Sequence, residues 1–185
     1  MAVDCKVLDL GCGRSKVPGA LGIDSSVRSD ADIIYDLNTF PYPFGDNTFD
    51  VIHCHGILEH LSNLSAVMEE IWRIAKPDAR IDIVAPYFTS VDSFTDLTHK
   101  HFFSARSMDY LTGEFPEYGY YSTARFRKAK VEILFWRLPR LGGLRIQHLL
   151  GAHWLANRFT SIYERFFAYL FPAQMIVWEL TVVKR

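Results

Sequence analysis

Short runs of apolar residues, each closed by turn-forming residues, recur along the chain and predict β-strands. We place these strands at residues 5–10, 20–24, 32–36, 50–54, 80–85, 129–137 and 175–183. Runs of this length and apolarity are typical of parallel strands that are buried on both faces of a sheet.

One stretch between the fourth and fifth strands follows a helical period instead. Its apolar positions recur at spacings of three and four: Leu58, Leu61, Leu64, Val67, Met68, Ile71 and Trp72. Ser62 is a candidate N-cap, and the pair Lys76-Pro77 marks the expected end of the helix. Strands that alternate with such a crossover predict an open α/β sheet, which binds ligands beyond the carboxyl ends of its strands.

Two stretches, 86–128 and 139–173, exceed what a minimal sheet needs. No linker rich in Pro, Gly or Ser separates them from the rest, so we predict one domain over residues 1–185 with two cap or lid insertions. Residues 149–171 carry an apolar, aromatic stripe at helical spacing. Burial against the sheet is its commonest explanation, and a homodimer face or a peripheral membrane contact are the alternatives.

Charge and cysteine content narrow the class of protein. Residues 1–99 hold 7 Lys and Arg against 15 Asp and Glu, whereas residues 100–165 hold 11 against 5. The basic part is either an uneven solvated surface or an acceptor-binding face. Without a run of Lys and Arg, nucleic acid binding is not indicated. The 3 cysteines lack metal-ligand spacing, no apolar run is long enough to cross a membrane and no secretory signal is evident, so we expect a cytoplasmic protein.

The stretch VLDLGCGRSKVPGALGID carries the clearest chemistry. Gly11 and Gly13 let the backbone approach a ligand closely after a strand, with turn amides directed at it. A dinucleotide site would need a third glycine where Lys16 stands, and a helix that the following Pro-Gly pair prevents. Asp9 would repel a phosphate and attract an ammonium group. The pattern therefore disfavours a nicotinamide oxidoreductase.

VLDLGCG resembles motif I of the class I S-adenosylmethionine (SAM)-dependent methyltransferases. LGID, IIYDLN, YPFGDNTFDVIHCHGILEHL and IWRIAKPDARIDIVAP resemble later segments of that family, in the same order, so the resemblance covers residues 5–88. It implies a Rossmann-like α/β sheet of seven strands in the order 3-2-1-4-5-7-6, with an antiparallel last strand and helical or loop insertions after strands five and six. It also implies SAM as cofactor.

The resemblance assigns roles to individual residues. Asp24 would hold the ribose hydroxyls, and Asp36 with Leu37 would lie near the adenine amino group. The complete predicted cofactor set is Asp9, Gly11, Cys12, Gly13, Asp24, Ser25, Asp36, Leu37 and His55.

Three departures from the family pattern matter. Asp78 stands where the family has glycine after Lys-Pro, which predicts a left-handed turn. The helix after motif I is reduced to a loop and the helices before the first strand are missing. The cofactor pocket is therefore expected to be open on that side, or covered by the insertions or by another subunit.

Histidines are the candidate bases for an oxygen acceptor, because imidazole takes a proton at neutral pH. From the set His53, His55, His60, His99 and His101, we predict His99 and His55 as catalytic. The segment PYFTSVDSFTDLTHKHFFS resembles the DPTHxxFF segment of a subset of small methyltransferases. If it folds back as a lid, it would place Tyr87, Asp96, Thr98, His99 and Phe102 above the methyl group. Alternatively, His99 only orders this loop.

A metal site is the weaker hypothesis for this region. Metal-assisted members of the family bind a divalent ion through Glu-x-x-Glu-His, and Gly56 replaces the first Glu here. We therefore predict helix packing for Glu59 and His60 and no metal, although His99 or His101 could replace the missing ligand.

The predicted function is in-line methyl transfer from SAM to an oxygen of a small-molecule, sugar or lipid-like acceptor. The alternatives are a SAM-binding, non-catalytic partner subunit and an N-methyltransferase.

Overall fold

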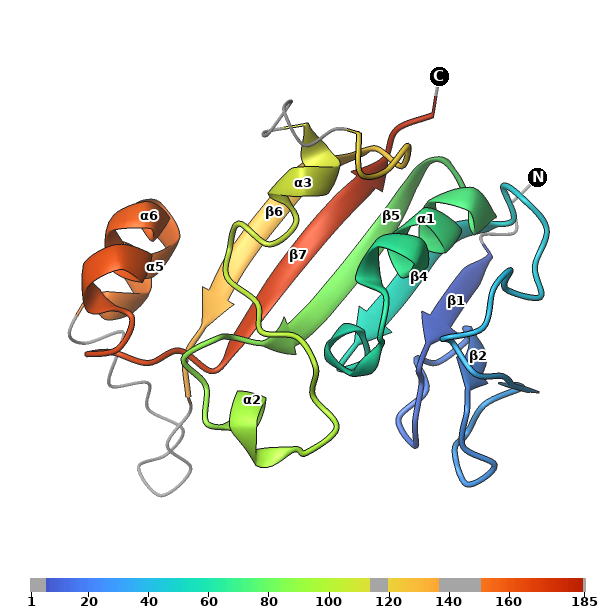
Figure 1. Ribbon diagram of the computed structural model, residues 1–185, viewed down its shortest axis with the longest axis horizontal. Coiled ribbons are helices and arrows are strands. Elements are labelled where there is room, and N and C mark those ends of the chain that lie inside the picture. The colour runs from blue at the N-terminus through green and yellow to red at the C-terminus, as the bar shows by residue number, and fades with distance from the viewer. Residues whose placement is uncertain (1–5, 114–119, 137–150, 185) are drawn as a thin grey trace.

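The computed structural model describes residues 6–113, 120–136 and 151–184, which form one seven-stranded sheet (Figure 1). The strands are β1 (Val7–Leu10), β2 (Leu21–Asp24), β3 (Ile33–Ile34), β4 (Phe49–His55), β5 (Ala75–Pro86), β6 (Phe126–Leu134) and β7 (Met175–Val182). Their order is β3-β2-β1-β4-β5-β7-β6. Strands β1 to β5 are parallel, and β7 runs antiparallel to both β5 and β6. The predicted fold class, strand order and antiparallel last strand are confirmed.

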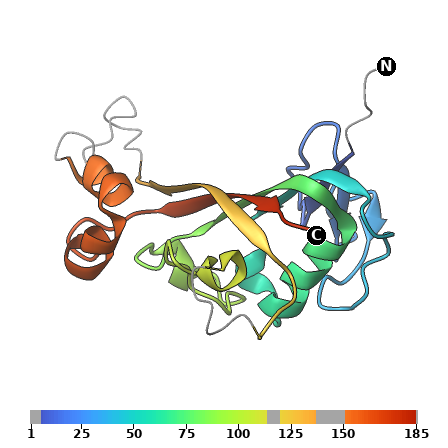
Figure 2. The same ribbon diagram turned by 90° about the horizontal axis from the view of Figure 1, so that it is seen from above.

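Helical segments occupy the connections after β4, β5 and β6. They are η1 (Leu58–His60), α1 (Leu64–Ile74), α2 (Asp92–Thr95), α3 (Asp109–Thr112), α5 (Ala152–Arg158), α6 (Thr160–Ile162) and the π-helical turn η4 (Tyr163–Phe167). Figure 2 shows α1, α2 and α3 on one side of the sheet. The pair α5 and α6 lies at the end of the molecule opposite to β1 and β2.

The single helix predicted after the fourth strand is divided in the structure. Leu61 is extended and separates η1 from α1. The N-cap of α1 is Asn63, whose side chain accepts a hydrogen bond from the amide of Ala66 at 3.1 Å, so the assignment to Ser62 is wrong by one residue. On either side of this break, η1 and α1 both contact β5. Because β5 begins directly after α1, the pair Lys76-Pro77 lies in the strand and does not end the helix.

The turn inside β5 follows the sequence prediction. Asp78 has a φ of 61°, which confirms the left-handed conformation expected where the family has glycine. At this point the pairing with β4 shifts register between Phe49 and Val51.

Strands β5 and β7 are fully buried on one face only, so the expectation of two buried faces, which concerned the parallel strands of the first half of the chain, is wrong for β5. Burial alternates along both strands, with Ala79, Ile81, Ile83, Ala85, Ile176, Trp178, Leu180 and Val182 buried. The other face carries charged residues, such as Arg80 and Asp82, paired at 3.0 Å. The described helices α1, α2 and α3 lie on one side only (Figure 2), and period-two alternation is what a one-sided sheet requires.

The two insertions contact one another. The hydroxyl of Tyr87 and the amide of Ala105 both donate to Glu164 Oε1, each at 2.8 Å. On the second insertion, the side-chain amide of Asn157 bonds the backbone amide and carbonyl of Ile133 at 2.8 and 3.0 Å, which fixes α5 against β6. The described part of the 139–173 stretch therefore packs beside the sheet and the first insertion.

Burial accounts for only part of the apolar stretch predicted at 149–171, of which residues 149 and 150 lie outside the described residues. Tyr163 is fully buried, but Trp154 is 62% exposed, Phe166 69% and Tyr169 81%. In the described ranges, no helix combines the length and the apolar character needed to cross a membrane.

Candidate functional site

The glycine turn after β1 packs closely against the segment that follows β4. Gly11 has a φ of +71°, and its amide donates to the carbonyl of Ile23 at 2.8 Å. A Cβ at this position would lie 2.4 Å from Cγ1 of Ile57, so only glycine fits. Gly13 also has a positive φ, +54°, but a Cβ there would meet nothing within 4 Å. The turn and the end of β4 therefore form one surface.

Asp24, at the end of β2, reaches across to this turn. Its Oδ2 accepts a hydrogen bond from the amide of Gly13 at 2.9 Å, and its Oδ1 accepts one from Ser26 at 2.8 Å. A carboxylate has about four acceptor positions, so about two remain for ligand hydroxyls. The neighbouring Ser25 is exposed.

Asp36 stands exposed after β3 on the same edge. Its Oδ1 accepts bonds from the backbone and side-chain amides of Asn38 at 2.9 and 3.0 Å, which lowers the pKa of the Asp36 carboxyl. Asn38 in turn accepts from the amide of Ser62 at 2.8 Å, so this loop is tied to the connection between η1 and α1. The side chain of Leu37 belongs to the hydrophobic core.

Asp9 and Cys12 lie beside the loop that stands in place of the helix expected after motif I. Asp9 is 3% exposed, and its Oδ2 accepts from the amide of Val17 at 2.7 Å. The thiol of Cys12 is buried, which raises its pKa, and a Cβ at Gly22 would lie 2.9 Å from its sulfur. Asp9 thus holds the short loop in place, while Cys12 packs against the second strand.

Two histidines, His53 and His55, lie two positions apart on β4. His55 is exposed at the carboxyl end of the strand, and its ring centroid lies 5.2 Å from that of His53. His53 Nδ1 lies 3.2 Å from Asp82 Oδ2, but among the described residues it has no hydrogen-bond partner. Burial lowers the pKa of His53, so its neutral form is favoured. Of the two, His55 is the imidazole available at the edge.

The segment after α2 docks on η1. The amide of Lys100 donates to the carbonyl of Glu59 at 2.7 Å, and Thr98 Oγ1 lies 2.8 Å from His60 Nδ1. His99 Nδ1 lies 3.2 Å from the carbonyl oxygen of Ser93, the within-loop contact that a loop-ordering role requires.

The five residues predicted for a lid do not gather at one point. Asp96, Thr98 and His99 surround His60 on η1. Tyr87 is instead fully buried, and burial near Glu164 raises the pKa of its hydroxyl well above the usual range. The exposed Phe102 stacks on Phe94, with ring centroids 4.9 Å apart.

Glu59 is buried on η1. Its side chain is 2% exposed, and its Oε2 has no hydrogen-bond partner among the described residues. A carboxylate oxygen of Glu59 and one nitrogen each of His60 and His99 lie within 4.8 Å of one another. In the sequence, the ILEH run places Glu59 beside His60 and so indicates part of this cluster. His99, the third member, comes from a distant segment.

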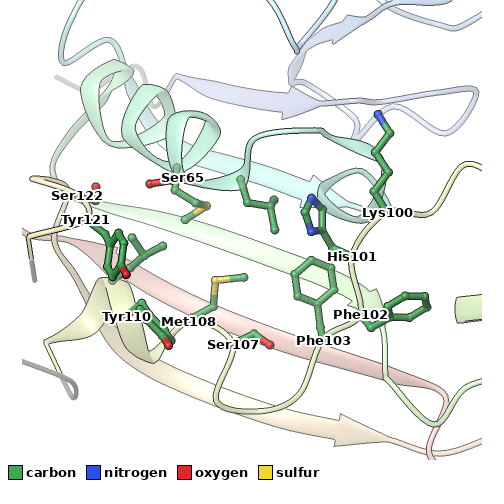
Figure 3. A pocket seen from close by; sticks show the side chains of 13 residues that line it. Ser65, Lys100, His101, Phe102, Phe103, Ser107, Met108, Tyr110, Tyr121 and Ser122 are labelled. Atoms are coloured by element: carbon green, nitrogen blue, oxygen red, sulfur yellow. The ribbon is translucent and has the colours of Figure 1, made fainter. Parts of the chain in front are cut away.

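A pocket of about 670 Å³ lies between α1, the segment 100–111 and Tyr121 (Figure 3). Its lining is largely apolar and aromatic: Leu64, Met68, Phe102, Phe103, Met108, Tyr110, Leu111 and Tyr121, with Ser65, Lys100, His101, Ser107 and Ser122 as the polar members. Lys100 and His101 stand at one end of it in Figure 3, where the segment docks on η1.

Comparison with known proteins agrees with this geometry. Residues 8–83 match the family described as "Methyltransferase domain". Among curated proteins, none matches the sequence. The structure is similar to a SAM-dependent methyltransferase from Archaeoglobus fulgidus, with a TM-score of 0.62, 19% identity, and coverage of 96% of this chain and 86% of that one.

Two further solved structures share the fold. A complex between the Haloferax volcanii Trm112 methyltransferase activator and a methyltransferase matches with a TM-score of 0.57 and 16% identity, covering 98% of this chain and 83% of that one. The [4+2]-cyclase SpnF matches with a TM-score of 0.57 and 15% identity, covering 98% and 75%.

The protein thus has the class I methyltransferase fold, and the resemblance inferred from its motifs is confirmed. Residues 8–83 match the methyltransferase-domain model, and this match together with the similar solved structures supports SAM as the cofactor.

Proposed function

We propose that the protein transfers the methyl group of SAM to an oxygen of a small-molecule, sugar or lipid-like acceptor. The observation that carries this proposal is the continuous edge made by the glycine turn, Asp24 and Asp36, with His55 beside it at the end of β4. The edge offers carboxylates and backbone groups, which suit a cofactor with hydroxyls, amines and a cationic sulfur.

SAM supplies an electrophilic methyl group on its sulfonium. In our proposal, Asp24 accepts hydrogen bonds from the ribose hydroxyls and Asp36 lies near the adenine. The backbone at Gly11 and Gly13 allows the remaining part of SAM to approach closely. Ser25, Cys12 and Leu37 would contact SAM through their backbone.

His55 and His99 are the proposed groups on the acceptor side. His55 is exposed at the edge, where its imidazole could take the proton of an acceptor hydroxyl. Much of the remaining rate enhancement would come from holding the acceptor in line with the methyl group. The 670 Å³ pocket beside α1 has room for an apolar part of such an acceptor.

Two alternatives have specific support. The fold is shared with a cyclase, so methyl transfer does not follow from architecture alone. Another structure with this fold was solved with an activator protein, which favours the hypothesis of a partner-dependent or non-catalytic subunit. N-methylation is the third possibility, since nothing at the edge selects oxygen over nitrogen.

Calorimetric titration with SAM, followed by assays with labelled SAM against hydroxyl and amine acceptors, tests the proposal. We expect SAM to bind and label to appear in a hydroxylated acceptor. Absence of binding at millimolar SAM refutes the enzyme hypothesis. Tight binding without turnover favours the partner subunit, and transfer only to amines favours N-methylation.

A homodimer or peripheral membrane contact through 149–171, and a cytoplasmic location, stay predictions. Sedimentation with and without lipid vesicles distinguishes the two contacts, because only a homodimer changes mass without lipid.

A further inference from the structure

The pocket beside α1 lies where two helices stand on different strands of the sheet. Helix α1 contacts β5 and the short helix α3 contacts β6, while β7 runs between these two strands. Gly113 ends α3 in a left-handed conformation after only 4 residues, so this helix does not continue beside α1. The cavity that is left, of about 670 Å³, has the size of a small-molecule site.

The floor of this pocket is apolar and rests on the sheet. Met68 comes from α1, Phe103 and Met108 come from the segment before α3, and all three are buried. The ring of Phe103 packs on Trp178 of β7, with ring centroids 5.9 Å apart. Methionine and aromatic side chains form a surface that suits an apolar chain and adapts to its shape.

Hydrogen-bond donors lie at one end of the pocket, where Figure 3 shows Lys100 and His101. Lys100 Nζ donates one of its three hydrogens to Ser62 Oγ at 2.8 Å, which leaves two for a ligand. His101 Nε2 donates to the carbonyl oxygen of Leu61 at 2.7 Å, so Nδ1 is the remaining polar atom of this ring. The opposite end, at Tyr121, is aromatic (Figure 3).

The charge of the lining favours one class of ligand. Among the described residues that line the pocket, none is acidic, and Lys100 alone carries a permanent positive charge. Two of the serines are bonded within the protein, because Ser107 Oγ accepts from the amide of Ser104 at 3.0 Å and Ser122 Oγ from that of Ala124 at 3.1 Å. A cationic ligand would meet no carboxylate in this lining, whereas an anionic group would meet an ammonium group with two hydrogens to donate.

We propose that this pocket binds an anionic amphiphile, with an acyl or similar apolar chain of medium length between α1 and α3 and a carboxylate or other anionic head group at Lys100. Burial of the chain on the apolar floor provides most of the affinity, because each CH₂ removed from water contributes. The ammonium group of Lys100 orients the ligand and selects its charge.

Hydrogen bonds connect the head-group end of the pocket with the proposed cofactor edge. Ser62, which accepts from Lys100, donates its amide to Asn38 Oδ1 at 2.8 Å, and Asn38 donates to Asp36. The head group would therefore lie on the cofactor side of the pocket. The assignment of such an amphiphile as the methyl acceptor rests on the proposed function, whereas its binding does not.

Calorimetric titration of the whole chain without SAM tests the proposal. Sodium decanoate and decyltrimethylammonium chloride are the probes, because they share a chain of about ten carbons and differ in the charge of the head group. We expect one decanoate per chain with a Kd of about 0.1 mM or tighter, and binding of the cation that is weaker by about 3-fold or more. Octanoate, which is two CH₂ groups shorter, should bind about 10-fold more weakly than decanoate.

Two pairs of variants locate the binding site. Ser65→Trp adds a large ring at an exposed position of α1 that lines the pocket and should weaken decanoate binding by about 10-fold or more, whereas Ser161→Trp adds the same ring at an exposed position of α6 and should not. Lys100→Gln should weaken decanoate binding by about 2- to 5-fold without weakening that of the cation. Lys130→Gln is its control, because Lys130 lies on β6 and is paired with Glu132 at 2.7 Å.

Absence of saturable decanoate binding below about 1 mM overturns the proposal. Equal affinities for the two probes, or equal losses in the two tryptophan variants, overturn it as well. Circular dichroism confirms that each variant is folded. A separate titration with SAM distinguishes this inference from the proposed function, because SAM binding without decanoate binding refutes only the amphiphile site, and decanoate binding without SAM binding refutes only the methyltransferase.

Discussion

Gly11→Ala tests whether the cofactor turn and the end of β4 form one rigid unit. The substitution forces a residue with a Cβ into a φ of +71°, which costs about 1–2 kcal/mol. Its Cβ would also lie 2.4 Å from Ile57 Cγ1, and overpacking of this kind costs about 1–3 kcal/mol more. We expect the free energy of unfolding to fall by about 2–5 kcal/mol, measured by urea denaturation.

Gly13→Ala is the control, because its φ is also positive but its Cβ would meet no atom within 4 Å. It should cost only the backbone part, about 1–2 kcal/mol. Ile57→Ala in the Gly11→Ala background removes Cγ1 and Cδ1 and should restore part of the loss, which a double-mutant cycle measures as a coupling. Equal destabilisation by the two glycine substitutions, with no coupling to Ile57, would show that the close approach does not determine the turn.

Three further predictions concern the edge, the open face and the insertions. Asp24→Ala should weaken SAM binding by about 10- to 100-fold in calorimetric titration, because hydrogen bonds to a charged group are worth about 1.5–3 kcal/mol. Asp50→Ala removes a carboxylate from a surface ion pair and should leave the affinity for SAM unchanged. Because burial depresses the pKa of His53, the contribution of this residue to the free energy of unfolding is complete above its unfolded pKa of about 6.5 and is lost as pH falls through the folded pKa. His53→Gln should reduce this loss below about pH 6.5 in urea titrations, and an unchanged pH dependence would contradict the prediction. Tyr87→Phe should lower the free energy of unfolding by about 1–3 kcal/mol, because it removes a hydrogen bond from a buried hydroxyl to the half-buried carboxylate of Glu164. Removal of the exposed hydroxyl in Tyr169→Phe should leave the free energy of unfolding unchanged.

The proposed cofactor edge was predictable from the sequence because its parts are local. Gly11 follows β1, Asp24 ends β2 and Asp36 lies two residues after β3, and parallel strands bring their carboxyl ends to one edge of the sheet. The left-handed turn at Asp78 was predictable for the same reason, since it depends on a few adjacent residues. The strand order, in contrast, came from the resemblance to a family.

The burial of the sheet was not predictable from apolar runs. Residues 80–83 alternate between charged and apolar side chains in the sequence, but which face of β5 is covered depends on α1, α2 and α3, which lie on one side of the sheet. The division of the predicted helix at Leu61 also depends on tertiary contacts, because η1 is held by the segment that begins near Thr98.

The sequence by itself determined the strands, the glycine turn and the acidic residues that end β2 and follow β3, because strand pattern and turn chemistry depend on neighbouring residues. Only the tertiary structure brought His99 to Glu59 and His60, and joined Tyr87 to Glu164 across the two insertions. Those contacts depend on how long loops pack, and a loop's path is set by the surface it meets, which no local pattern encodes.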